Sequence, residues 1–135
     1  MAYVAASVEI AVDPDSVWAL IGPFGAISDW LPGFERAELE DGGRVRRLFA
    51  ADGSVFLERM VNFDDSGRSC TYTILEAPLG VADHRATLQV QGLGNGSSSR
   101  VDWTAAFTPT VASQDAASVM QGFFDSGLAA VARMF

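Results

Sequence analysis

Six strand-like segments in direct succession, followed by one long helix-like segment, restrict the fold of this chain more than any other feature. The six segments cover residues 35–40, 44–50, 55–64, 70–76, 83–91 and 99–108. Each carries the residue pattern of a strand, and short turns rich in glycine, aspartate and serine separate them. Strands joined by such short turns are most simply antiparallel, because a parallel connection needs about a dozen residues or more.

One further strand and two short helices are expected before this series. The strand covers residues 3–12, and the D-P-D sequence at residues 13–15 is typical of a helix start, with its first or last aspartate as the N-cap. The G-P pair at residues 22–23 ends this helix. A second short helix is expected over residues 25–30, just before another proline-glycine pair.

After Pro109 the pattern changes from alternation to helical spacing, which continues to Phe135. A long terminal helix is therefore expected to begin between residues 110 and 115. Its apolar positions are Ala116, Val119, Met120, Phe123, Gly127, Ala130, Val131 and Met134. The fold class is α+β: a curved, seven-stranded antiparallel sheet with helices on one face.

The size and charge of the chain exclude several classes of function. A length of 135 residues indicates one domain. The formal net charge of -8 argues against binding to nucleic acid or to an anionic membrane surface. All nine basic residues are arginine, and the absence of lysine excludes Schiff-base chemistry and a P-loop.

Reactive side chains are scarce in this sequence. The single cysteine, Cys70, has no partner for an internal disulfide, and one histidine cannot supply a two-histidine metal site. We expect no metal and no cofactor. The apolar N-terminus has no basic residue and contains Glu9, so it predicts neither a signal peptide nor a membrane span. We expect a cytoplasmic monomer or homodimer without stable membrane insertion.

The only histidine, His84, lies on the apolar side of an alternating segment. Counting back in steps of two from Val90 through Leu88 and Ala86 places it among these residues. A histidine in a pocket could hydrogen-bond a ligand or move protons, because its reference pKa of about 6.5 is close to neutrality. The alternative is a partly exposed histidine at a strand end, bonded to the backbone.

Glu58 lies on a strand face that also carries Phe56 and Met60. A carboxylate among such neighbours is costly unless it is paired or has a function. One interpretation is therefore a pocket carboxylate that serves a ligand. The alternative is a buried ion pair with an arginine of the preceding strand, Arg46 or Arg44.

Other candidate residues carry less information. Asp102 shares its strand face with Arg100 and Thr104, which by itself indicates solvent. Tyr72 is a core residue or a ligand contact, and its hydroxyl needs a partner wherever it is buried. Of the three tryptophans, Trp30 is the one expected to touch a ligand, and Cys70 is expected to be a small core residue.

The element order and a series of short motifs resemble the START-like superfamily, in its polyketide cyclase/dehydrase branch. The motifs are D-S-V-W at residues 15–18, D-W-L-P-G at 29–33, Gly53 followed by E-R at 58–59, D-D at 64–65, Y-T-I at 72–74, P-L at 78–79, and Trp103 with F-T-P at 107–109. The resemblance implies a helix-grip fold over residues 1–135 as a single START-like domain. It also implies an internal cavity, of a few hundred Å³, for a hydrophobic ligand.

Residues 58–90 are also similar to a segment of the plant abscisic-acid receptors and align with it without a gap. The resemblance implies that a set of residues faces a cavity: Glu58, Tyr72, Ile74, Val81, His84, Ala86, Asp102, Val119, Phe123 and Gly127. Three further residues are candidates. Trp30 and Leu31 are expected near the entrance, and Phe56 shares the strand face of Glu58. Leu31 stands where the receptors have a carboxylate-binding lysine, and the gate and latch residues are not matched. These differences argue against hormone sensing.

Three classes of function follow from this resemblance. The first is a protein that carries, sequesters or senses a hydrophobic small molecule bearing a polar group. The second is a cyclase or dehydratase, with Glu58 as the base and His84 or Tyr72 supporting an enolate. The third is a protein-interaction module. We rank binding first, because catalysis also requires an acid and a base to converge on one substrate atom.

Overall fold

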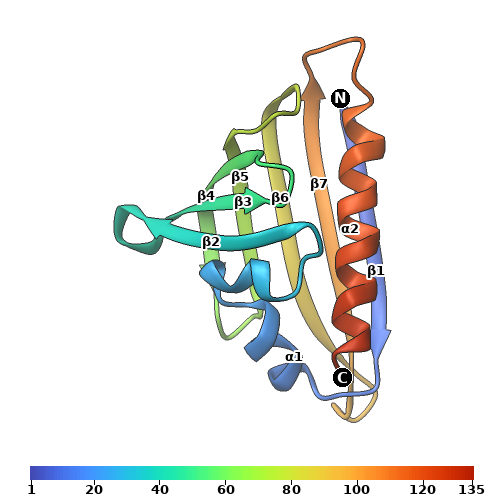
Figure 1. Ribbon diagram of the computed structural model, residues 1–135. Coiled ribbons are helices and arrows are strands. Elements are labelled where there is room, and N and C mark those ends of the chain that lie inside the picture. The colour runs from blue at the N-terminus through green and yellow to red at the C-terminus, as the bar shows by residue number, and fades with distance from the viewer.

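In the computed structural model, which describes residues 1–135, a seven-stranded sheet curves around a C-terminal helix (Figure 1). The elements are β1 (Ala2–Ile10), α1 (Pro14–Ile21), the 3-10 helix η1 (Phe24–Asp29), β2 (Phe34–Glu40), the 3-10 turn η2 (Asp41–Gly43), β3 (Val45–Ala50), β4 (Val55–Asp64), β5 (Ser69–Glu76), β6 (Val81–Leu93), β7 (Ser98–Pro109) and α2 (Ala116–Arg133). The strand order is β1-β7-β6-β5-β4-β3-β2, and every neighbouring pair is antiparallel. The helix-grip fold expected from the sequence is confirmed.

The terminal helix α2 lies along β1 and β7 at one end of the sheet (Figure 1). Its inner face is held by aromatic packing: the rings of Trp103 and Phe124 stack with centroids 4.1 Å apart. Strands β2 to β5 curve away from this helix (Figure 1). Neither α1 nor α2 combines the length and apolar character that a membrane crossing requires.

Helix α2 begins at Ala116, one residue later than the expected range. Asp115 is its N-cap, and its side chain accepts a hydrogen bond from the backbone N–H of Ser118. The residues before it are held in a loop, because the Gln114 side chain accepts from the Gly80 N–H at 2.7 Å. This contact joins the start of α2 to the β5–β6 turn.

Helix α1 begins where the D-P-D sequence predicts, with Asp13 as its N-cap. The Asp13 carboxylate accepts from both the backbone N–H and the hydroxyl of Ser16, at 3.0 and 2.7 Å. These hydrogen bonds lower the pKa of Asp13, because they stabilise its charged form.

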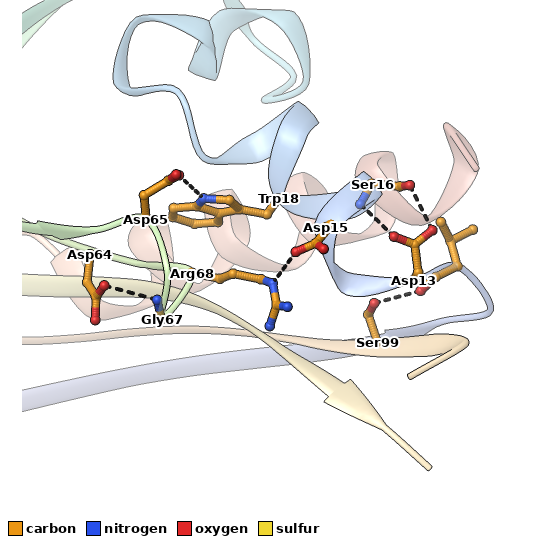
Figure 2. A network of polar contacts seen from close by, with 10 residues as sticks. Asp13, Asp15, Ser16, Trp18, Asp64, Asp65, Gly67, Arg68 and Ser99 are labelled. Carbon is orange, nitrogen blue, oxygen red and sulfur yellow. Dashed lines mark hydrogen bonds and ion pairs between the residues drawn. The ribbon is translucent and has the colours of Figure 1, made fainter. Parts of the chain in front are cut away.

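Polar contacts fix α1 against the turn between β4 and β5 (Figure 2). The indole N–H of Trp18 donates to Asp65 at 2.8 Å, and the Arg68 guanidinium donates to Asp15 at 2.9 Å. Trp18 also stacks on Phe63, with ring centroids 5.6 Å apart. These contacts hold the chain that leads into η1 and then into Trp30 and Leu31.

Candidate ligand-binding site

Two neighbouring spaces lie between α2 and the strands β2 to β6. The inner cavity has a volume of about 40 Å³, and the outer pocket has a volume of about 450 Å³. The inner cavity is lined by Ile27, Leu31, Phe34, Leu48, Phe56, Glu58, Tyr72, Ile74, Leu79, His84, Trp103, Met120, Phe123 and Phe124. The outer pocket is lined by Gly33, Phe34, Ala50, Ala51, Asp52, Ser54, Phe56, Pro78, Leu79, Val119 and Phe123.

The inner cavity is much smaller than the few hundred Å³ expected from the sequence. A volume of about 40 Å³ holds only a few water molecules. Aromatic side chains account for the difference, because Phe34, Phe56 and Phe123 pack against one another at its outer wall. The larger volume lies outside these rings, in a pocket lined partly by the exposed residues Ala51 and Asp52.

Glu58 is buried in the wall of the inner cavity and forms an ion pair with Arg46. The Arg46 Nε donates to Glu58 Oε1 at 2.8 Å, and the guanidinium also donates to the Phe24 carbonyl at 3.1 Å. The same guanidinium lies over the rings of Phe24 and Tyr72, 4.1 and 4.7 Å from their centroids. The alternative of a buried pair is confirmed, and the partner is Arg46.

His84 is buried, and its imidazole has a defined hydrogen-bonding direction. Its Nδ1 accepts from the backbone N–H of Ile74 at 3.1 Å. Burial lowers the pKa of His84 to about 4, so the ring is neutral at neutral pH. A neutral ring that accepts at Nδ1 carries its proton on Nε2, which is therefore a donor.

Tyr72 is buried beside His84, with ring centroids 5.9 Å apart. Its hydroxyl oxygen accepts from the indole N–H of Trp103 at 3.0 Å. Burial, together with the nearby charge of Glu58, raises the pKa of Tyr72 well above its ordinary value. The phenol therefore keeps its proton and has it available for donation.

Two polar atoms of this group have no partner within the protein: His84 Nε2 and Glu58 Oε2. The only fully enclosed side-chain nitrogen or oxygen without a partner is Trp30 Nε1. His84 Nε2 and Glu58 Oε2 also have no partner but are not fully enclosed, so both keep some access to open space. The space beside both residues is the inner cavity, which they line.

Comparison with known proteins assigns the chain to a family. A family model described as polyketide cyclase / dehydrase and lipid transport matches residues 1–135. The chain belongs to this family. No curated protein matches the chain.

Several solved structures have the same fold. The protein XoxI from Bacillus cereus is 39% identical, with a TM-score of 0.93 over 100% of this chain and 96% of that chain. A protein from Bacillus thuringiensis is 37% identical, with a TM-score of 0.93 over 99% of this chain and 98% of that chain. The Zhui aromatase/cyclase from Streptomyces sp. R1128 is 19% identical, with a TM-score of 0.80 over 98% and 92%, a likeness of fold alone.

Some residues expected at the site of this polyketide cyclase/dehydrase family member do line the spaces described above. Leu31, Phe56, Glu58, Tyr72, Ile74, His84 and Phe123 line the inner cavity. Val119 does not reach that cavity and lines the outer pocket instead, with its side chain half exposed.

Asp102 does not face the cavity. Its neighbours Val101 and Trp103 are buried in the core, so strand alternation directs Asp102 to the opposite face of β7. There it accepts a hydrogen bond from Arg100 at 3.0 Å. The inward placement implied by the resemblance is wrong, and the interpretation from the strand pattern is correct.

Val81 and Ala86 also do not line either space, although both belong to β6. Asp83 has a φ of 51°, and the pairing with β7 shifts between Ala82 and Arg85. This bulge separates Val81 from the alternation that brings His84 inward. Ala86 is buried in the core, where it pairs across the sheet with Tyr72 and Ala105.

Trp30 and Gly127 lie together in the core and not at an entrance. Trp30 is buried and packs edge-on against Trp103, with ring centroids 5.4 Å apart. A Cβ atom on Gly127 would lie 2.9 Å from Leu31 and 3.0 Å from Trp103. Gly127 therefore allows α2 to approach these side chains closely and contributes no wall to the cavity.

The sequence interpretation did not include several residues that line the cavity. Phe34, Leu48, Leu79, Trp103, Met120 and Phe124 are the clearest cases. For Phe124 a signal was present, because its position four residues after Met120 and seven before Val131 places it on the buried face of α2. The strand residues lacked such a signal, since alternation shows an inward side chain but not the cavity it meets.

Proposed function

We propose that this protein binds a small, largely apolar molecule whose polar oxygen accepts hydrogen bonds from Tyr72 and His84. The observation that carries the proposal is the direction of the His84 imidazole: Nδ1 is occupied by the Ile74 N–H, so Nε2–H is left as a donor beside the cavity. Tyr72 keeps its proton beside it. Two neutral donors in an apolar wall suit an acceptor oxygen such as a carbonyl.

The surroundings support a ligand with an apolar body. Twelve of the fourteen residues that line the inner cavity are hydrophobic. The outer pocket of about 450 Å³ lies within the range of volumes typical of small-molecule sites. The family description also includes lipid transport, which agrees with an apolar ligand.

Binding of the fluorescent naphthalene ketone prodan tests this proposal. The variant Tyr72→Phe removes the phenol proton, and we expect it to weaken prodan binding about fivefold, the effect of losing one hydrogen bond of roughly 1 kcal/mol. N-phenyl-1-naphthylamine, which has no carbonyl, should bind both forms equally. Equal losses for both probes would indicate a packing defect, and no binding of either probe would contradict the proposal.

A second candidate is an enzyme that removes a proton from the carbon next to a carbonyl. The specific observation in its favour is the unpartnered Glu58 Oε2 beside the two neutral donors. Glu58 would take the proton from carbon, and the enolate oxygen would accept hydrogen bonds from Tyr72 and His84. Exchange of the Glu58 proton with solvent, followed by its transfer back to the carbon, would complete an exchange reaction and restore the carboxylate.

Deuterium exchange at the methyl group of 2-acetonaphthone, followed by NMR in D2O, tests this second candidate. If Glu58 is the base, Glu58→Gln should lower the exchange rate by roughly 10²–10⁴-fold and leave the affinity for the ketone near that of the original chain. Exchange at the uncatalysed rate in the original chain would exclude this activity for simple aryl ketones.

A further inference from the structure

Three phenylalanine rings stand between the inner cavity and the outer pocket. Phe34, Phe56 and Phe123 line both spaces, together with Leu79. Their ring centroids are 5.3 Å apart for Phe34 and Phe56, 5.7 Å for Phe34 and Phe123, and 5.9 Å for Phe56 and Phe123. We call these three residues the phenylalanine partition.

The members of the partition come from different parts of the fold. Phe34 begins β2 and Phe56 lies in β4, and both are buried. Phe123 lies on α2, which packs mainly on β1 and β7 at the other end of the sheet. Its ring therefore reaches from the helix across to the β2 and β4 side, and it closes the partition from the helix.

The two spaces on either side of the partition differ in their size and in the polar side chains that line them. Tyr72, His84 and Glu58 line only the inner cavity, which holds no more than a few waters. The outer pocket has room for a ligand body, but its polar side chains are Asp52 and Ser54, and Asp52 Oδ1 already accepts from the Ser54 N–H. None of Tyr72, His84 and Glu58 lines the outer pocket.

We infer that the phenylalanine partition is movable, and that displacement of Phe123 joins the two spaces into one binding site. This inference rests on the proposed function. Phe123 is the member that moves, because it is only half buried, whereas Phe34 and Phe56 are buried. Val119, one helical turn earlier, is half exposed at the outer pocket, so the ring has space on that side. The size of residue 123 then determines how readily a ligand reaches Tyr72 and His84.

Two measurements with prodan test this inference. The first is the association rate from stopped-flow fluorescence, compared between the original chain, Phe123→Ala and Phe123→Leu. The second is the side-chain ¹⁵N shift of His84, which is unambiguous because the chain has one histidine. Phe135→Ala is the matched control, since it removes an exposed phenylalanine just beyond the end of α2. Thermal unfolding of each variant shows whether it is folded.

We expect saturating prodan to shift the His84 resonance in every protein, which shows that the ligand passes the partition. Phe123→Ala should raise the association rate at least tenfold, Phe123→Leu by less, and Phe135→Ala not at all. A His84 shift that occurs only in Phe123→Ala would identify a fixed wall and overturn the inference. Equal association rates in all variants would also overturn it.

These failures differ from a failure of the proposed function. If Tyr72→Phe weakens prodan binding but Phe123→Ala leaves the association rate unchanged, the binding function stands and the movable partition does not. If prodan binds none of the proteins, including Phe123→Ala, both proposals fail.

Discussion

Arg46 and Glu58 are direct cross-strand partners in β3 and β4, and their ion pair of 2.8 Å is almost completely buried. Side-chain exposure is 6% for Arg46 and 8% for Glu58. The pair therefore lies in an apolar environment, where each charge depends on the other for compensation. Arg46 places its charge between the rings of Phe24 and Tyr72, behind the wall of the inner cavity.

Removal of the Arg46 guanidinium should destabilise the protein more than removal of the negative charge of Glu58. We expect Arg46→Met to lower the free energy of unfolding by roughly 3–5 kcal/mol, because a buried carboxylate is left without its partner. Glu58→Gln keeps an oxygen that can accept from Arg46 and should cost roughly 1–3 kcal/mol. Urea unfolding curves measure both.

The exposed pair of Arg59 and Asp41, 3.4 Å apart, offers a matched control. Arg59→Met should change stability by only about 0–1 kcal/mol, since solvent screens this pair. The double variant Arg46→Met with Glu58→Leu should recover part of the loss. A cost for Arg46→Met no larger than that for Arg59→Met would contradict the importance of the buried pair.

The free energy of unfolding should decrease at acidic pH because of His84. Its pKa of about 4 in the folded protein is below the reference value of 6.5. Between these values the unfolded chain holds a proton that the folded protein does not, so the stability is complete above about pH 6.5 and declines as the pH falls toward 4. The difference between these two pKa values corresponds to a loss of about 3 kcal/mol in the free energy of unfolding.

His84→Asn isolates this contribution, because the amide oxygen can replace Nδ1 as acceptor for the Ile74 N–H but does not titrate. The free energy of unfolding of the variant should depend less steeply on pH between 6.5 and 4. NMR titration of the His84 side chain gives the folded-state pKa directly. A measured pKa near 6.5 would contradict the conclusion that burial removes the imidazole from solvent.

Two glycines of α2 should respond in opposite ways to substitution by alanine. At Gly122 a Cβ atom meets no other group within 4 Å, so Gly122→Ala should raise stability by roughly 0.5–1 kcal/mol through helix propensity. At Gly127 the added methyl group collides with Leu31 and Trp103, and overpacking costs roughly 1–3 kcal/mol. Thermal unfolding of the two variants provides the comparison, and a stabilising Gly127→Ala would show that the helix has room to shift.

The alternating pattern predicted the sheet well because most of the strands have one face toward the core. It placed Glu58 and His84 inward and Asp102 outward, as the structure has them. The error at Asp102 came from the resemblance, which carried over a cavity position that the strand pattern did not support. The choice between Arg46 and Arg44 stayed open, because it depends on the cross-strand register of β3 and β4.

The volume of the cavity could not be predicted in this way. It depends on how the rings of Phe34 and Phe123 pack across β2 and α2, and no periodicity records a contact between such distant elements. The start of α2 was displaced for a related reason, since Gln114 bonds the Gly80 N–H and not the first turn of the helix. Both features depend on tertiary contacts between segments far apart in the sequence.

The final prediction compares two tryptophans that touch each other but differ in their indole N–H groups. Trp103 Nε1 donates to Tyr72 at 3.0 Å, whereas Trp30 Nε1 is enclosed without a partner. Both rings are buried, so substitution by phenylalanine removes a similar packing contribution from each. An enclosed donor without a partner already costs roughly 1–3 kcal/mol. We therefore expect Trp30→Phe to cost at least 1 kcal/mol less than Trp103→Phe in urea unfolding, and Trp103→Phe alone to change the ultraviolet spectrum of Tyr72. Equal costs would indicate that the Trp30 N–H has a partner in solution.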